Sequence, residues 1–130
     1  MFISFQMLEH IISPIQFLKS LSDKSECRRF VITVPYLKNS RAALYYIRNN
    51  CLTKQVAEDT HIFELSPTDW KLIFKFSGWK IVFDKIYYQY PQKGIYSLTK
   101  NAWQQNDFEG FYGVVLEKDD TYKKLYMDWD

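Results

Sequence analysis

Two adjacent residues near the start of the chain, Glu9 and His10, place a carboxylate and an imidazole just after an apolar segment. That segment, Phe2–Phe5, is too short for a helix and predicts a buried strand. Polar side chains just past the carboxyl end of a strand lie where open α/β sheets bind their ligands. Because an imidazole titrates near neutral pH, His10 could act as a general base. The alternative, that both side chains only hydrogen-bond to neighbouring loops, stays open.

The elements that would position these residues follow as strand, helix and strand. Ser13-Pro14-Ile15-Gln16 has the pattern of a capping box and predicts the start of a helix. The β-branched run at Arg28–Pro35 predicts a second strand, which we expect to stop at the proline. Two strands joined by a helix within about 35 residues predict a crossover unit and a parallel sheet.

The rest of the chain predicts further helices and strands. Apolar residues at helical spacing predict a helix over Asn39–Asn50, followed by a polar connection. Ser66-Pro67-Thr68-Asp69 predicts the start of another helix, which Gly78 ends. We expect strands at Trp79–Tyr87 and Gly110–Glu117, with a short helix near Ser97–Trp103 between them.

Composition limits the function classes. Apolar residues make up 47% and aromatic residues 18% of 130 residues, which predicts one folded globular domain or part of one. The net charge of +2 predicts no nucleic-acid partner, and no apolar run reaches the length of a membrane span. Cys27 and Cys51 lack the paired spacing of a zinc site, and the N-terminus lacks a basic leader, so we expect a cytoplasmic protein.

Four segments, in order, resemble those of class I S-adenosylmethionine-dependent methyltransferases. They are Ile3–Ile11 (the family's fourth strand), Val31–Pro35 (its fifth), Phe63–Trp70 with Ser77–Ile81 (its last helix and sixth strand) and Phe108–Leu116 (its closing antiparallel strand). The resemblance covers nearly the whole chain. It implies an α/β fold, a Rossmann-like methyltransferase half-domain with a mostly parallel sheet of strands four to seven and an antiparallel last strand. Residues 1–130 would then be the C-terminal part of a single methyltransferase domain.

The resemblance also implies an activity, which is methyl transfer from S-adenosylmethionine to an oxygen, nitrogen or carbon of a small acceptor. Catalysis would rest on proximity and in-line displacement. The roles it implies fall into three groups: Glu9 and His10 would be catalytic, Phe5 and Gln6 would line the methionine end of the cofactor, and Tyr45, Arg48 and His61 would border the acceptor.

Some members of this family, among them small-RNA and quinone O-methyltransferases, hold a divalent metal at these positions with carboxylate and imidazole groups. His61 is the only other histidine of the chain and could approach Glu9 and His10 from the loop before the last helix. Gln6, however, stands where the small-RNA enzymes carry a further glutamate, so one negative charge is lost. We therefore expect no metal.

The family's glycine-rich cofactor turn has no counterpart in the sequence. The four glycines, at positions 78, 94, 110 and 113, all lie in the second half. We therefore expect the N-terminal cofactor-binding half to be missing and the chain to be inactive alone. The alternative is a non-catalytic remnant or interaction module, which pairs with a complementary N-terminal chain or with itself through an exposed edge at Phe2–Phe5.

Overall fold

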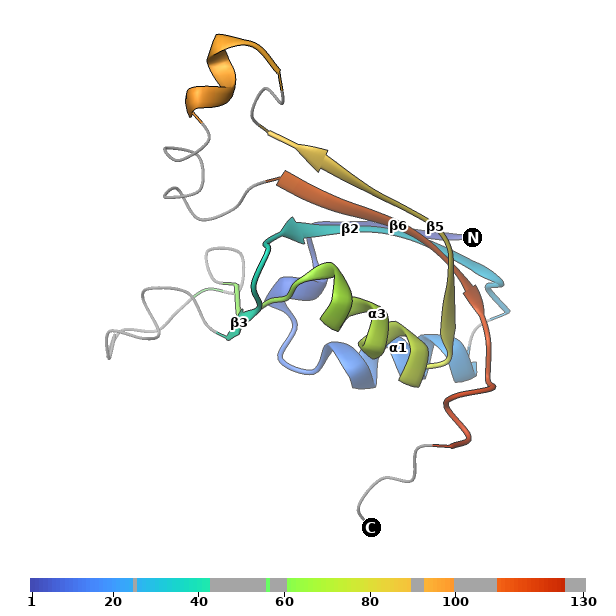
Figure 1. The fold of residues 1–130 in the computed structure, drawn as a ribbon. Coiled ribbons are helices and arrows are strands. Elements are labelled where there is room, and N and C mark those ends of the chain that lie inside the picture. The colour runs from blue at the N-terminus through green and yellow to red at the C-terminus, as the bar shows by residue number, and fades with distance from the viewer. Residues whose placement is uncertain (25, 43–55, 57–60, 90–92, 100–109, 126–130) are drawn as a thin grey trace.

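A computed structural model describes residues 1–24, 26–42, 56, 61–89, 93–99 and 110–125. Two helices cover one face of a four-stranded sheet (Figure 1). The sheet contains β1 (Phe2–Phe5), β2 (Arg29–Tyr36), β5 (Trp79–Tyr88) and β6 (Gly110–Lys118), and the helices are α1 (Pro14–Lys24) and α3 (Pro67–Phe76). Shorter elements complete the described chain: the 3₁₀ turns η1 (Leu8–His10) and η3 (Ile95–Thr99), and a separate two-stranded pair, β3 (Arg41–Ala42) and β4 (Phe63–Glu64).

The order of the strands is β1-β2-β6-β5, which corrects the expected fold class. β1 and β2 pair in parallel, as the crossover through α1 predicts. β6 is antiparallel to both β2 and β5. Because β6 lies between strands that share one direction, the sheet is mixed, and most of its pairing is antiparallel. The prediction of a mostly parallel, Rossmann-like half is therefore wrong.

The second strand also passes the proline at which it was expected to stop. Pro35 pairs with Phe111, and β2 ends one residue later. The oxygen of Thr33 accepts a hydrogen bond from the Gln6 amide on the β1 side, and backbone groups alternate in direction along a strand. The nitrogen of Pro35 therefore faces the same side, beyond the end of β1, where no strand of the described residues pairs with β2 and needs an amide donor.

The helix predicted to start at Ser66-Pro67-Thr68-Asp69 and to end at Gly78 is confirmed as α3. Ser66 caps the helix by accepting a hydrogen bond from the Asp69 amide, and Pro67 occupies the first turn. Gly78 follows the C-cap with φ +88°, in the left-handed region that favours glycine. The helix expected over Asn39–Asn50 is wrong at its start, because Arg41 and Ala42 form β3; residues 43–50 lie outside the described residues.

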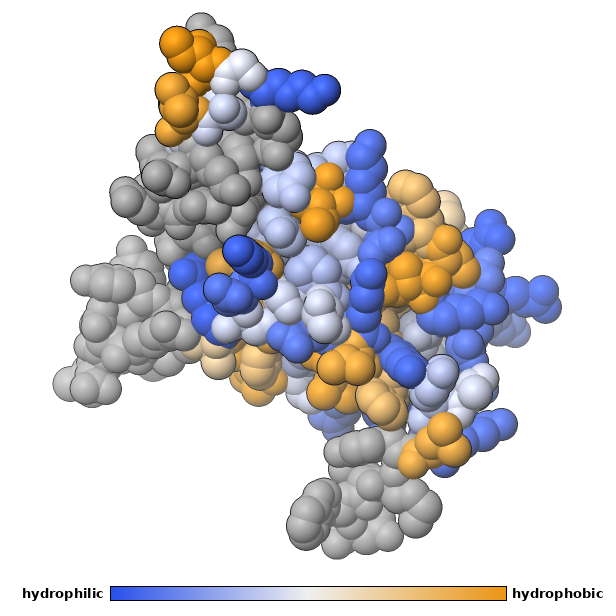
Figure 2. Space-filling view, in the orientation of Figure 1, coloured by the Kyte–Doolittle hydropathy of each residue, from blue (hydrophilic) through white to orange (hydrophobic). Residues whose placement is uncertain are grey.

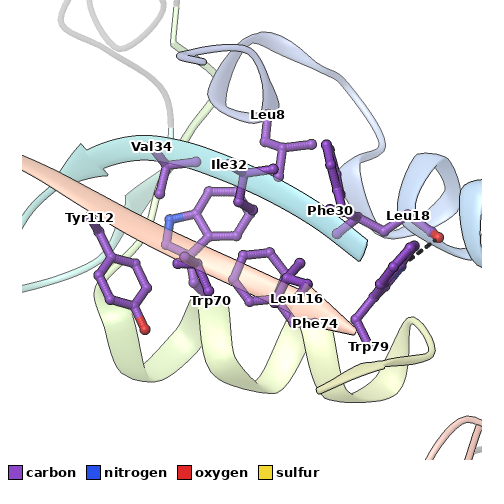
Figure 3. Packing of buried hydrophobic residues seen from close by; sticks show 11 residues of the cluster. Leu8, Leu18, Phe30, Ile32, Val34, Trp70, Phe74, Trp79, Tyr112 and Leu116 are labelled. Atoms are coloured by element: carbon purple, nitrogen blue, oxygen red, sulfur yellow. Dashed lines mark hydrogen bonds between the residues drawn. The ribbon is translucent and has the colours of Figure 1, made fainter. Parts of the chain in front are cut away.

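The core lies between the helices and the sheet (Figure 3). Trp70 and Phe74 of α3 stack with ring centroids 5.6 Å apart, against alternate residues of β2 and β6. The Trp79 indole donates a hydrogen bond of 3.0 Å to the Leu18 carbonyl, which ties the start of β5 to α1. Leu8 of η1 is also fully buried, so the turn after β1 is anchored in the same core.

β1 forms one edge of the sheet and leaves large apolar side chains exposed. The exposed fractions of Phe2, Ile3 and Phe5 are 44%, 55% and 65%. Apolar patches separated by hydrophilic side chains also lie on the face drawn in Figure 2. Neither α1 nor α3, the two α-helices of the described chain, is long and apolar enough to cross a membrane.

Candidate metal centre

The chain turns sharply where β1 ends, and this turn presents Glu9 and His10. Gln6 adopts φ 49°, an uncommon conformation for a residue with a side chain. Its amide donates to the Thr33 carbonyl at 3.0 Å, and its side-chain amide donates to the Thr33 hydroxyl at 3.1 Å. Both bonds fasten the turn to β2. With Leu8 held in the core, η1 places the next two residues at the carboxyl end of β1.

Three side chains from two distant segments converge there. One ligand atom each from Glu9, His10 and His61 lies within 4.8 Å of the other two. The rings of His10 and His61 meet edge to face, with centroids 4.6 Å apart and planes at 82°. His10 Nε2 lies 3.9 Å from Glu9 Oε1, and the Ile62 amide donates to the Glu9 carbonyl at 2.7 Å. This backbone bond fixes the segment that carries His61 against η1.

Glu9 is the most unusual member of the cluster. Its side chain is fully buried, and neither carboxylate oxygen has a hydrogen-bond partner among the described residues. Burial raises the pKa of Glu9, and the nearby imidazoles of His10 and His61 lower it by less. A buried carboxylate without a partner is costly unless a positive charge compensates it.

Glu64 also contacts the cluster, and the sequence analysis did not predict it. Its Oε1 atom lies 2.6 Å from His61 Nδ1, and its Oε2 atom accepts a hydrogen bond from Arg41 Nε. Burial would raise the pKa of Glu64, but the hydrogen bonds and charges of His61 and Arg41 outweigh it and lower that pKa. The spacing His61-x-x-Glu64 was the available signal, but His61 lies before β4, and only the folded segment brings its ring against the Glu64 carboxylate.

The structure brings together only part of the predicted site. Glu9, His10 and His61 form one cluster, whereas the Gln6 side chain bonds to Thr33 and Phe5 is exposed at the edge strand. The positions predicted to border the acceptor pocket, Tyr45 and Arg48, lie outside the described residues.

The donor set of the cluster fits a divalent transition metal. Zinc binds imidazole nitrogen and carboxylate oxygen at about 2.0–2.2 Å, and three protein ligands leave a position for a further ligand. Donor atoms on one tetrahedral zinc are therefore about 3.4 Å apart. The present spacing of up to 4.8 Å requires a closure of the side chains by little more than 1 Å.

A broad surface hollow lies elsewhere and does not belong to this cluster. Its volume is about 660 Å³, and it is lined by Met1, Arg28, Arg29, Glu117 and Lys118. Met1, Arg28 and Arg29 lie at the amino ends of β1 and β2, and the other two residues end β6, whereas Glu9 follows the carboxyl end of β1. Arg29 and Glu117 form an ion pair at 2.8 Å across the strands, so these two charges already compensate each other.

The chain matches no protein-family model and no curated protein sequence. The residues of the cluster and their geometry therefore carry the functional argument.

Proposed function

We propose that the chain binds one divalent transition-metal ion, of the zinc or cobalt type, through Glu9, His10 and His61. The observation that carries the proposal is the buried carboxylate of Glu9, which has no hydrogen-bond partner among the described residues but faces two imidazoles. A bound cation would compensate the negative charge of the Glu9 carboxylate, which is costly to bury in a low-dielectric surrounding. The sequence-based expectation of no metal depended on Gln6, and three donors remain without it.

This proposal changes the role of His10. A metal ligand uses the lone pair of a neutral imidazole nitrogen, so the same nitrogen cannot accept a proton from a substrate. His10 would bind the ion rather than act as a general base. The competing arrangement, a protonated histidine paired with Glu9, is less well supported, because His10 Nε2 is 3.9 Å from the carboxylate and makes no hydrogen bond with it.

Methyl transfer is the reaction class that we propose for the site. Support comes from the resemblance at Ile3–Ile11, whose polar residues lie at the carboxyl end of β1. A divalent ion held there by Glu9, His10 and His61 would supply an electrophilic site for an acceptor oxygen or nitrogen. Phe5 and Gln6 would face S-adenosylmethionine bound largely by another chain or segment, since no described helix starts from a glycine-rich turn.

Titration calorimetry tests metal binding directly. We expect one equivalent of Zn²⁺ or Co²⁺ to bind with a Kd on the order of 1 μM or tighter. Mg²⁺ and Ca²⁺, which prefer all-oxygen sites, should bind at least about 100-fold more weakly. The double variant Cys27→Ser/Cys51→Ser is the matched control for adventitious thiol binding and should leave the affinity unchanged. Zn²⁺ binding no tighter than Mg²⁺ binding would contradict the proposal.

A second titration, with S-adenosylmethionine added to the metal-loaded chain, tests the methyl-transfer part separately. We expect weak binding by this chain alone, because most of the cofactor contacts would come from elsewhere. Restored binding after addition of a chain with a glycine-rich cofactor turn would support methyl transfer. Micromolar binding by the isolated chain would contradict the expected division of the cofactor site.

The exposed β1 edge favours a second function, association with another strand. β1 has no proline, lysine or bulge to prevent pairing, and Phe2, Ile3 and Phe5 are exposed along it. We expect the chain to self-associate, with Ile3→Lys shifting it towards the monomer. Leu72→Lys is the matched control, because Leu72 is 50% exposed on α3, which offers no strand edge. Light scattering that shows a monodisperse wild-type monomer at high concentration would refute this function.

A further inference from the structure

Behind the three proposed ligands, two more residues form a chain of hydrogen bonds to His61. Arg41 and Glu64 are directly opposite each other in the register of β3 and β4. Arg41 Nε donates to one oxygen of Glu64, and the other oxygen lies 2.6 Å from His61 Nδ1. The side chain of Glu64 is 1% exposed and that of Arg41 is 29% exposed. Each oxygen of the buried carboxylate therefore has its own partner.

This arrangement selects one tautomer of His61. A carboxylate paired with a guanidinium only accepts hydrogen bonds, so the proton of a neutral His61 ring must be on Nδ1. The lone pair is then on Nε2, the form of imidazole that a metal ligand requires. In known metal sites a carboxylate behind a ligating histidine fixes both the tautomer and the ring orientation.

We propose that Glu64, held in place by Arg41, is a positioning residue that fixes the tautomer and ring orientation of His61 for metal binding. This inference rests on the proposed metal site. The backbone bond from Ile62 to Glu9 sets where the segment lies, and the hydrogen bond from His61 to Glu64 sets how the ring is turned. These two bonds thus connect the two-stranded β3–β4 unit, which is otherwise separate from the main sheet, to the end of β1.

The first measurement needs no metal. Long-range nitrogen–proton NMR on the metal-free protein at about pH 8, where a free histidine ring is neutral, reports the tautomer of each histidine. We expect His61 to carry its proton on Nδ1 in the wild type. In Glu64→Gln, Arg41 and His61 compete for the single amide oxygen, so the Nδ1 form should decrease only in part. Glu64→Ala removes the acceptor, and the proton should move to Nε2 in a large part of the population. An unchanged tautomer in Glu64→Ala would overturn the proposal.

The second measurement is zinc affinity in the same variants. Glu64→Ala should weaken binding by about 10–100-fold, the usual effect of losing a carboxylate behind a metal ligand. Glu64→Gln should weaken it by less than about 10-fold. Equal losses in the two variants would indicate a direct ligand and overturn the positioning role. If the wild type binds no zinc, the proposed function fails, while the tautomer result still decides the role of Glu64.

Two further variants keep the test independent of folding. Arg41→Met removes the guanidinium at a partly exposed position, and we expect the Nδ1 tautomer to persist while the affinity falls several-fold. Unchanged affinity would remove Arg41 from the proposal. Glu117→Gln is the matched control, because it breaks a cross-strand ion pair with Arg29 far from the cluster and should change neither readout.

Discussion

Glu9→Gln should strongly weaken metal binding and, at neutral pH, make the metal-free protein more stable. The Glu9 carboxylate is fully buried without a hydrogen-bond partner in the described structure, so a neutral amide of the same shape removes an uncompensated charge. We expect the free energy of unfolding to rise by about 1–2 kcal/mol. Zinc affinity should fall by about 100-fold or more, since losing a metal ligand costs more than losing a residue that only hydrogen-bonds to a ligand.

The pH dependence of stability follows from the direction of the pKa shift. The pKa of Glu9 is raised above its usual 4.5 by burial, so the folded state holds this proton more tightly than the unfolded state. The metal-free wild type should therefore lose stability as pH rises from the unfolded pKa through the folded one, and Glu9→Gln should lack this loss. Urea unfolding across this pH range, with a chelator present, measures the difference.

Two comparisons sharpen this experiment. Glu64→Gln should have the opposite effect at neutral pH, because the pKa of Glu64 is lowered and its charge stabilises the fold. Zinc at about 100 times its Kd should stabilise the wild type by about 2.7 kcal/mol and leave Glu9→Gln unchanged. A Glu9→Gln variant that is less stable than the wild type throughout this range would contradict the interpretation of Glu9 as a strained, metal-directed carboxylate.

The second large effect is expected at the two histidines. His10→Ala and His61→Ala should each lower zinc affinity by about 100-fold or more. With only three protein ligands, each ligand contributes a large share of the binding free energy. Both rings are only 19% exposed, so circular dichroism and urea unfolding must accompany the calorimetry. Small and equal losses at the two positions would leave both imidazoles with a structural role only.

The order and type of the longer elements could be predicted from local signals. Ser66 and Gly78 mark the ends of α3, and the strands at Phe2, Arg29, Trp79 and Gly110 were expected within a few residues of their observed bounds. The sheet pattern could not be predicted in this way. Which strand lies beside β2 depends on pairing over 88 positions, from Arg29 to Glu117, and no local pattern encodes it.

The candidate site was predictable in the same partial way. Glu9 and His10 were found because they follow a recognisable strand, and His61 because it is the only other histidine. Glu64 was missed because β3 and β4 contain two residues each, too few for an alternating pattern. Their pairing depends on the contact between Arg41 and Glu64, which only the folded chain brings together.

The central position of β6 has a consequence for how the protein is made. During synthesis, β1, α1 and β2 leave the ribosome long before residues 110–118, yet β2 has no neighbour on its second side until those residues arrive. One side of β2 therefore stays unpaired in the nascent chain while the residues between Tyr36 and Gly110 are made. Such late, long-range pairing slows folding and extends the period in which chaperones or aggregation compete for the chain.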